Sequence, residues 1–238
     1  ERMHKLLLQL RDDLAPSVEL LAGLKFPEFE RDTEYVALVS DADEYPLFSG
    51  EVGSSDGVRK AKADYRAMTN EFLLPHSTAK HARLSRSSYM VGALARFNLN
   101  QAKLHPKAQA VAQRIGLFPP CQNPYLITAA QLVECVHCAE EALVLVEALI
   151  GRGIDAQEAV VVGVNESGMI PVRAGSGVGA VEVPRGLLFH HYRVDDAGII
   201  REANCVIPTS QNLQNLEDDM RQLVPQILDQ TEAEITLA

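Results

Sequence analysis

The sequence predicts an α+β fold with a helix-dominated, multihelical core, a small N-terminal β-hairpin and a C-terminal β-hairpin region. Apolar residues at helical spacing fill the middle of the chain, whereas short β-like runs bounded by turn residues lie before and after it. The sequence has no internal repeat, low-complexity tract or linker. We therefore expect one unit over 1–238, with the hairpin at about 34–53, the helical core at about 58–151, the β region at about 160–208 and the C-terminal helix at about 213–230.

Two short helices are predicted at the N-terminus. The leucines from Leu6 to Leu14 lie at helical spacing, and Pro16 then interrupts the pattern. Proline lacks the N–H that a helix interior uses, so the first helix is expected to end there. A second short helix is expected over 18–24.

The hairpin follows these helices. Strands are expected over 35–39 and 46–52, because both runs are apolar and rich in β-forming residues. The acidic run 41–44 between them is typical of a turn. The two strands are therefore predicted to pair as neighbours.

The core is predicted to contain four helices separated by breaks. The Asp56-Gly57 turn precedes the first helix and Pro75 ends it, Gly116 closes the third, and Asn123 is suited to cap the fourth. The fourth is apolar over much of its circumference, so it is expected to be central. The predicted ranges are 58–74, 78–95, 107–115 and 123 to about 150.

The last third of the chain is predicted to be mostly β-structure, followed by a helix. The glycine-rich run 175–179 is expected to be a flexible turn, and Pro225 is expected to kink the final helix. The expected strands are 160–164, 187–194 and 199–207, the last two joined by a turn at 195–198.

Charge and apolar content exclude several classes of partner. The net charge of −10, from 22 basic and 32 acidic residues, opposes binding to nucleic acid, which needs Lys and Arg to neutralise phosphates. The longest apolar stretch, 142–150, contains Glu147 and is shorter than the roughly 20 residues of a membrane span. No secretory signal is visible in 1–10, and four irregularly spaced cysteines do not make a disulfide framework. A cytoplasmic protein is expected.

The run Gly175-Ser-Gly177-Val-Gly179 resembles part of a dinucleotide-binding loop. Such a loop joins a strand to the N-terminus of a helix, where the phosphates bind. Here the run leads through Pro184 into an apolar strand. A nucleotide site is therefore disfavoured.

Cys135 and Cys138 lie three residues apart on the predicted central helix, so both side chains can reach one ligand. A structural zinc ion needs four ligands, and Cys121 and Cys205 are distant in sequence. Cysteine is also an ordinary small buried residue. Packing is favoured over zinc binding, which stays as the alternative.

His190 and His191 are adjacent on a predicted strand. Their imidazoles should point to opposite faces of the sheet, because side chains alternate along a strand. The two are therefore not expected to bind one ion together.

Arg185 lies between a glycine-rich turn and a continuous apolar strand, so its guanidinium is predicted to be partly desolvated. A desolvated guanidinium needs an anion. An ion pair with a core carboxylate, Asp12 or Glu182, is favoured on these grounds. A functional site is the alternative.

Six separated motifs then combine into a pattern. They are Glu51–Asp56, Pro75-His76-Ser77, Ser88–Asn98, Gly177–Gly186, His190–Ile199 and Asn204–Asn212. In this order they resemble the large, catalytic subunit of cytoplasmic nickel–iron hydrogenases, in the group linked to NAD(P) or coenzyme F420. The similarity extends over nearly the whole chain.

The resemblance implies an oxidoreductase that reversibly cleaves H2 at a Ni–Fe centre whose iron carries two cyanides and a carbon monoxide. The family holds these metals with two Cys-x-x-Cys motifs, one near each end of its large subunit, and neither is present in this chain. Cys135 and Cys138 lie between the places where those motifs belong. The resemblance thus implies a central fragment that has no metal ligands, binds no cofactor and is inactive alone.

The same resemblance implies residues that surround the centre. Arg185 is implied to lie over the open coordination position, held there by Asp12, and these two are the implied catalytic residues. Charge-assisted donors orient cyanide in an apolar pocket. The residues implied to contact the cofactor are Pro184, Arg185, Pro208, Thr209 and Ser210.

The implied partners are electron-transfer subunits, among them an iron–sulfur small subunit, and neither nucleic acid nor a membrane. Apolar faces left without these partners predict self-association of the fragment. Two other functions stay open. One is a cofactor-free, hydrogenase-like scaffold of the complex I kind, and the other is a zinc-binding module that uses Cys135 and Cys138.

Overall fold

The computed structural model describes residues 1–159 and 170–237 and has the predicted α+β architecture. The α-helices are α1 (Arg2–Gly23), α2 (Tyr65–Thr69), α3 (Ala93–Asn100), α4 (Pro106–Ile115), α5 (Ile127–Arg152), α6 (Pro208–Ile227) and α7 (Glu232–Leu237). The strands are β1 (Glu34–Val39), β2 (Glu51–Ser54), β3 (Arg59–Lys60), β4 (Tyr89–Met90), β5 (Gly175–Val183), β6 (Gly186–Val194) and β7 (Ile200–Val206).

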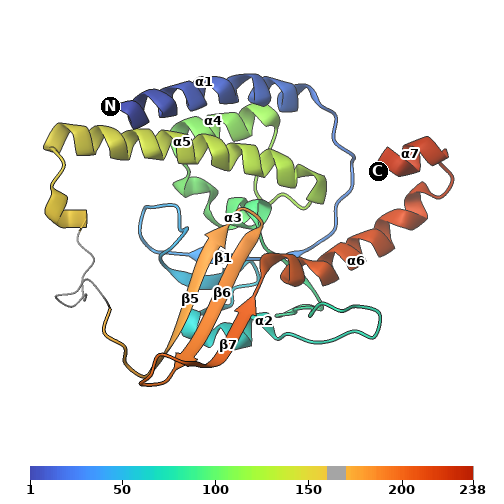
Figure 1. Cartoon of the computed structure of the whole chain (residues 1–238). Helices are drawn as coiled ribbons and strands as arrows, with labels where there is room; N and C mark the ends of the chain where they lie inside the picture. Colours follow the sequence, from blue (N-terminus) through green and yellow to red (C-terminus); the bar gives the residue numbers. More distant parts are fainter. Residues whose placement is uncertain (160–169, 238) are drawn as a thin grey trace.

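Helices and sheets form separate layers (Figure 1). α1, α4 and α5 lie side by side as a helical layer, and α3 lies between this layer and β1. One sheet has the order β3-β2-β1-β4 and the other has the order β5-β6-β7. Two clusters of buried side chains follow this division, one under the helical layer and one between the two sheets. α3 thus connects the helices to the sheets.

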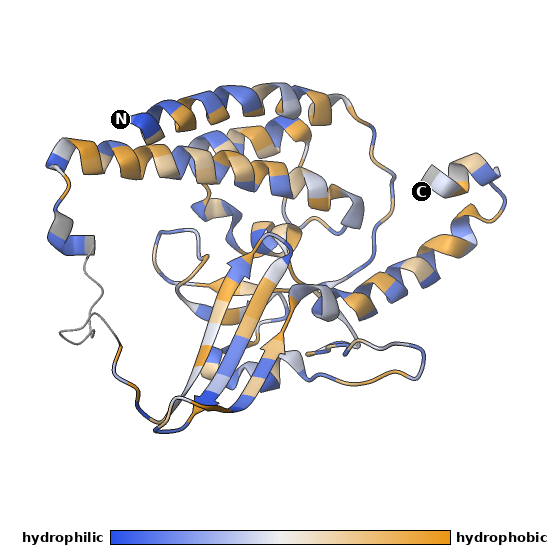
Figure 2. Ribbon diagram, viewed as in Figure 1, coloured by the Kyte–Doolittle hydropathy of each residue, from blue (hydrophilic) through white to orange (hydrophobic). Residues whose placement is uncertain are grey.

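α1 is a single helix of 22 residues, so the prediction that Pro16 ends the first helix is wrong. A proline inside a helix costs about 3 kcal/mol. Packing offsets this cost, since Val18 is buried and Leu14 and Leu21 pack against the same core cluster. Hydrophobic and polar residues alternate around α1 in Figure 2, as an amphipathic helix on a core requires.

The two most regular helices of the core form as predicted. α4 begins with Pro106 and ends at Gly116, which has a φ of 83°. Asn123 accepts a hydrogen bond from the Tyr125 N–H and leads through a short 3-10 segment into α5. The 26 residues of α5 form the centre of the helical layer, and much of this helix is hydrophobic in Figure 2.

The predicted helices over 58–74 and 78–95 are wrong. Only α2 and the beginning of α3 lie in these ranges, while β3 and β4 are strands. The N–H groups of Ser85 and Arg86 donate to the buried carboxylate of Glu34, at 3.0 and 3.1 Å, so a distant side chain replaces their helical partners. The segment can therefore adopt a non-helical structure, because residues distant in the sequence provide hydrogen-bond partners for its backbone N–H groups.

The N-terminal hairpin is confirmed, with β1 antiparallel to β2. The second strand begins at Glu51, later than predicted, and the sheet is larger than a hairpin. β4 adds to the other side of β1 in parallel, and β3 adds to β2. β1 is buried along nearly its whole length for this reason.

The C-terminal sheet contains the predicted strands 187–194 and 199–207, joined through Asp195–Gly198. The run 175–179, predicted as a flexible turn, instead belongs to β5 and pairs with β6 along its length. Glycine has little conformational preference of its own, so the partner strand decides its structure. The predicted strand 160–164 lies outside the described residues.

α6 begins at Pro208, whereas the sequence predicted a start near 213. Pro208, Thr209 and Ser210 form its first turn, where proline's missing N–H costs nothing. Pro225 lies inside the helix without ending it. None of the helices over 1–159 and 170–237 combines the length and the apolar character that crossing a bilayer requires.

Candidate functional site around the Pro184–Arg185 turn

Pro184 and Arg185 form the tight turn between β5 and β6, because Val183 pairs directly with Gly186. The turn lies against the residues that follow β4. A Cβ atom on Gly186 would lie 2.4 Å from Val91 Cγ2, and one on Gly92 would lie 3.1 Å from the Arg185 carbonyl oxygen. Both glycines also have positive φ angles, 132° and 116°. Glycine at these two positions allows the turn to pack directly on the end of β4.

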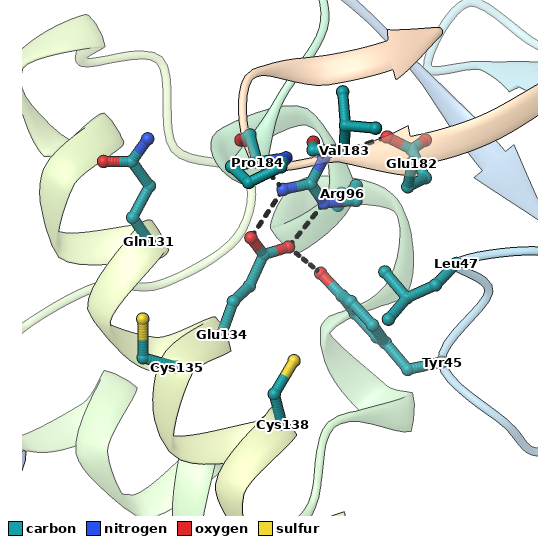
Figure 3. A pocket seen from close by; sticks show the side chains of 10 residues that line it. All are labelled: Tyr45, Leu47, Arg96, Gln131, Glu134, Cys135, Cys138, Glu182, Val183 and Pro184. Carbon is teal, nitrogen blue, oxygen red and sulfur yellow. Dashed lines mark hydrogen bonds and ion pairs between the residues drawn. The ribbon is translucent and has the colours of Figure 1, made fainter.

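A buried arginine holds the turn from the other side. Arg96 Nη1 donates to the Val183 carbonyl oxygen at 2.9 Å, and its Nη2 donates to the Pro184 carbonyl oxygen at 3.2 Å. The same guanidinium donates to Glu182 Oε2 at 2.9 Å and to both carboxylate oxygens of Glu134, at 2.5 and 2.6 Å (Figure 3). Arg96 therefore joins α3, α5 and the β5–β6 turn.

Charge explains why these groups are tightly paired. Burial acts to lower the pKa of Arg96, but the hydrogen bonds and charge of Glu134, with the charge of Glu182, leave it raised. Burial raises the pKa of Glu182, against the opposing effect of Arg96. Tyr45 Oη donates to Glu134 Oε1 at 2.8 Å, and burial next to this carboxylate raises the pKa of Tyr45. Each of these groups is hydrogen-bonded within the cluster, as buried polar groups require.

A cavity of about 470 Å³ opens beside this cluster. Cys135 and Cys138 project into it from α5 (Figure 3). Both residues are exposed although their thiols are partly desolvated, so the interpretation of these cysteines as small buried residues is wrong. Partial burial and the nearby Glu134 raise the pKa of both thiols. Within the described ranges, no group of three or more His, Cys, Asp or Glu side chains could hold a metal ion.

A second cavity, of about 200 Å³, lies on the other side of Pro184. Arg185 and Thr209 both line it, although they are far apart in the sequence. Asn212 fixes α6 here, because its side chain accepts from the Val91 N–H at 2.8 Å and donates to the Val91 carbonyl at 3.2 Å. The turn and the start of α6 are thus brought to one place.

The predicted partners of Arg185 are not found. Arg185 is exposed and makes no hydrogen bond or ion pair with the residues that the structure describes. Asp12 lies on α1 and accepts from Arg11 at 3.3 Å, and Glu182 pairs with Arg96. The expectation that one of these carboxylates holds Arg185 is therefore wrong, because Arg96 is the arginine that the interior encloses.

The residues of the second cavity suit an anionic group. Arg185 offers an unengaged cation, and Thr209 an exposed hydroxyl. α6 begins without a side-chain cap, so N–H groups of its first turn are open to an acceptor. Val91, Ala93, Ile127 and Leu213 provide apolar walls. These residues could surround an anionic group, and none of the residues that line the cavity is a His, Cys, Asp or Glu.

Arg96, Glu134 and Asn212 were not identified as site residues from the sequence, although a signal existed for the first two. Arg96 interrupts the apolar run 89–97, and Glu134 interrupts an apolar helix. A charged side chain in such a position requires an opposite charge. The sequence does not say which of the 32 acidic residues supplies it.

Comparison with known proteins identifies the class to which this fold and turn belong. The family model described as nickel-dependent hydrogenase matches residues 54–223, which is more than half of the chain. The chain therefore belongs to the nickel-dependent hydrogenase family, as its motifs predicted.

Two curated relatives illustrate the similarity. The chain is 27% identical over 225 residues to the alpha subunit of sulfhydrogenase 1 from Pyrococcus furiosus, covering 93% of this chain and 50% of that protein. It is 28% identical over 204 residues to a subunit of the vhu F420-non-reducing hydrogenase from Methanococcus voltae, covering 80% and 46%. The chain thus spans about half the length of these relatives.

A solved structure supports the fold. The chain matches an NAD+-reducing NiFe hydrogenase in the H2-reduced state with a TM-score of 0.68. The match has 23% sequence identity and covers 91% of this chain and 50% of the solved chain. At this identity the likeness shows the large-subunit fold alone.

Proposed function

We propose that this chain acts as part of the large subunit of a nickel–iron hydrogenase, an oxidoreductase that reversibly cleaves H2. The family match over residues 54–223 supports this activity. The proposal assigns to the described residues the surroundings of the Ni–Fe centre and not its ligands. By itself the chain is therefore proposed to bind no metal and to be inactive.

The observation that carries the proposal is the meeting of Arg185 with Thr209 in one cavity. The hydrogenase resemblance required an arginine and a hydroxyl beside the same cofactor. The two come from a β-turn and a helix start that Asn212 and the Gly92–Gly186 contact hold together. Two motifs without a shared function would not be expected to place an arginine and a hydroxyl in the same cavity.

Each residue has a proposed role. When bound, the Ni–Fe centre supplies the redox chemistry, with cyanide and carbon monoxide on its iron. Thr209, Ser210 and the start of α6 are proposed to donate hydrogen bonds to a cyanide. The Arg185 guanidinium is proposed to stabilise developing charge beside the centre, and Pro184 to restrict its backbone. Arg96 is a positioning residue, because its guanidinium donates to carbonyl oxygens of the turn and does not line the cavity that contains Arg185 and Thr209.

Partners follow from the same assignment. The relatives bear the names of hydrogenase subunits, and the name of one of them contains the word iron-sulfur. We propose that this chain binds electron-transfer subunits, one of which is an iron–sulfur small subunit. The predicted cytoplasmic location stays a prediction.

The proposal is tested in the complete protein, expressed from its full gene together with the genes of the neighbouring subunits. Arg185→Lys should lower H2 turnover about 100-fold, because lysine offers one point charge in place of a planar fork of donors. Bound nickel should be unchanged. Arg193→Lys, an exposed arginine farther along β6, is the matched control and should keep wild-type turnover.

Three results would contradict the proposal. Wild-type turnover in Arg185→Lys would remove the role of Arg185. A folded complete protein without nickel and without H2 turnover would favour the cofactor-free scaffold. Stoichiometric zinc in the purified 238-residue chain would favour the zinc-binding module through Cys135 and Cys138.

A further inference from the structure

The β5–β6–β7 sheet carries a second group of reactive side chains on the face away from the core. His191, on the inner face, contacts the Tyr65 hydroxyl, whereas His190 points to the outer face. In the sheet register, His190 lies directly across from Cys205 of β7. Tyr192, two residues farther along β6, has its side chain on the same outer face.

The three side chains form a closed triangle. His190 Nδ1 lies 2.8 Å from Tyr192 Oη, Cys205 Sγ lies 3.4 Å from the same Nδ1, and Sγ lies 3.5 Å from Tyr192 Oη. All three distances are within hydrogen-bond range, which is longer for sulfur. Cys205 is thus placed next to both a proton acceptor and a hydroxyl donor.

The triangle is open to small molecules. Gly179 and Gly177 of β5 lie opposite His190 and Tyr192, and a Cβ at either glycine would meet no atom within 4 Å. Cys205 is exposed and Tyr192 is 37% exposed. Besides His190 and Tyr192, the strand neighbours of Cys205 on this face are Leu188 of β6 and Ala203 of β7, and neither carries a charge.

The other three cysteines have different surroundings. Cys121 is buried, and the thiolate forms of Cys135 and Cys138 are disfavoured by partial burial and then by the charge of Glu134. Among the described histidines, His190 is the one that lies within hydrogen-bond range of a cysteine sulfur. Cys205 is therefore distinguished by its partners and not by exposure alone.

We propose that Cys205 is a reactive thiol, activated by His190 and Tyr192, and that it takes hydroperoxides as its substrate class. His190 Nδ1 accepts the thiol proton. The resulting imidazolium N–H and the Tyr192 hydroxyl then donate to the thiolate sulfur, which is the nucleophilic form of cysteine. This modification site is independent of the cavity at Arg185.

The reaction balances without another component. The thiolate attacks one peroxide oxygen, the S–O bond forms and the O–O bond breaks. The leaving hydroxide takes the proton from His190 and becomes water. Cys205 is oxidised by two electrons to a sulfenic acid, and the peroxide is reduced.

The test uses the 238-residue chain, low concentrations of hydrogen peroxide and dimedone, which traps sulfenic acids. Mass spectrometry of the peptides gives a separate rate for each cysteine. Cys205 should react at least about tenfold faster than Cys135 or Cys138, because hydrogen bonds from His190 and Tyr192 stabilise its thiolate form. The two α5 cysteines are internal controls in the same tube.

Variants test whether His190 and Tyr192 cause the high reactivity of Cys205. His190→Phe should lower the Cys205 rate about tenfold and leave the rates at Cys135 and Cys138 unchanged. Tyr192→Phe removes one donor, keeps the ring, and should lower the Cys205 rate to a smaller extent. His76→Phe, an exposed histidine that pairs with Glu217, is the matched control and should have no effect.

Equal rates at Cys205 and Cys135 in the wild type would overturn the proposal, and so would unchanged rates in both triangle variants. If His190→Phe alters the fold, the rates at Cys135 and Cys138 will change as well. In that case Tyr192→Phe decides: a lower Cys205 rate supports activation, and an unchanged rate refutes it.

Discussion

At the scale of the residue, Arg96 is a positively charged side chain in the interior. It is 2% exposed and forms ion pairs with two carboxylates, Glu134 and Glu182. A buried ion pair is weak evidence for stability in itself, because desolvation costs about as much as the attraction gives. Removing one partner is different, since the other charges are then left buried and uncompensated. Because Arg96 also donates to the Val183 and Pro184 carbonyl oxygens, its loss is expected to weaken the turn as well as the ion pairs.

We predict that Arg96→Met destabilises the protein by about 3–5 kcal/mol, because Glu134 and Glu182 lose their cation. Urea unfolding followed by circular dichroism measures the free energy of unfolding. Arg66→Met removes an exposed partner of Glu202 and is the control, which should change little. Equal and small effects in the two variants would show that the buried cluster is not needed for folding.

His137 gives a prediction about pH. It is buried under α4, accepts the His105 N–H at 3.0 Å, and burial lowers its pKa below the ordinary 6.5. The unfolded chain therefore binds this proton at a higher pH than the folded protein. Lowering the pH through 6.5 should favour the unfolded state until the lowered folded pKa is passed.

The measurement compares urea midpoints at about pH 7.5 and about pH 5.0 in the wild type and in His137→Asn, which keeps an acceptor near the position of Nδ1. The wild type should lose more stability between these pH values than the variant, by about 1.4 kcal/mol for each unit of pKa depression. His76→Asn, at an exposed site, should behave as the wild type does. Parallel losses in all three proteins would mean that His137 titrates normally.

At the scale of the element, the β5–β6 turn depends on two close backbone approaches. Gly186→Ala should destabilise the protein by at least about 2 kcal/mol, because the new Cβ overlaps Val91 and the φ of 132° is strained for alanine. Gly177→Ala lies in the same sheet, meets open space and is the control. Thermal unfolding followed by circular dichroism checks both, and equal midpoints would show that the turn does not rest on β4.

Elements with local signals could be predicted from the sequence, and those built by distant partners could not. α4 and α5 follow from their caps and apolar periodicity. The segment 58–92 carries similar apolar spacing, yet apart from a short helical stretch that includes α2 it forms β3, β4 and irregular chain, because β1 and β2 supply pairing partners and Glu34 supplies an acceptor. Helix propensity is a weak preference that such contacts override.

At the scale of the whole molecule, apolar side chains are exposed along one stripe of α6. Leu216, Met220, Val224 and Leu228 recur every four residues and are 36–66% exposed. A contiguous apolar surface of this kind favours association. α6 and the following α7 also extend away from the helical layer in Figure 1, so this stripe is accessible.

We predict that the 238-residue chain self-associates and that Met220→Glu with Val224→Glu reduces the association, because charges on the stripe must be desolvated in an interface. Light scattering should give a mass above 26.1 kDa for the wild type and a lower mass for the double variant. Leu73→Glu, at another exposed leucine, is the control and should leave the mass unchanged. A monomeric wild type at high concentration would contradict the prediction.

The sequence by itself determined the family, the α+β class and the central helix, since each motif, cap and apolar period that predicts them is written in residues close together in the chain. Only the tertiary structure decided which arginine is enclosed, that Thr209 begins a helix beside Arg185, and that Cys205 faces His190. The physical reason is the distance along the chain over which each kind of interaction acts. Caps, turns and periodicity act over a few residues, whereas the partner of a buried charge or a paired strand is chosen by packing among segments tens of residues apart.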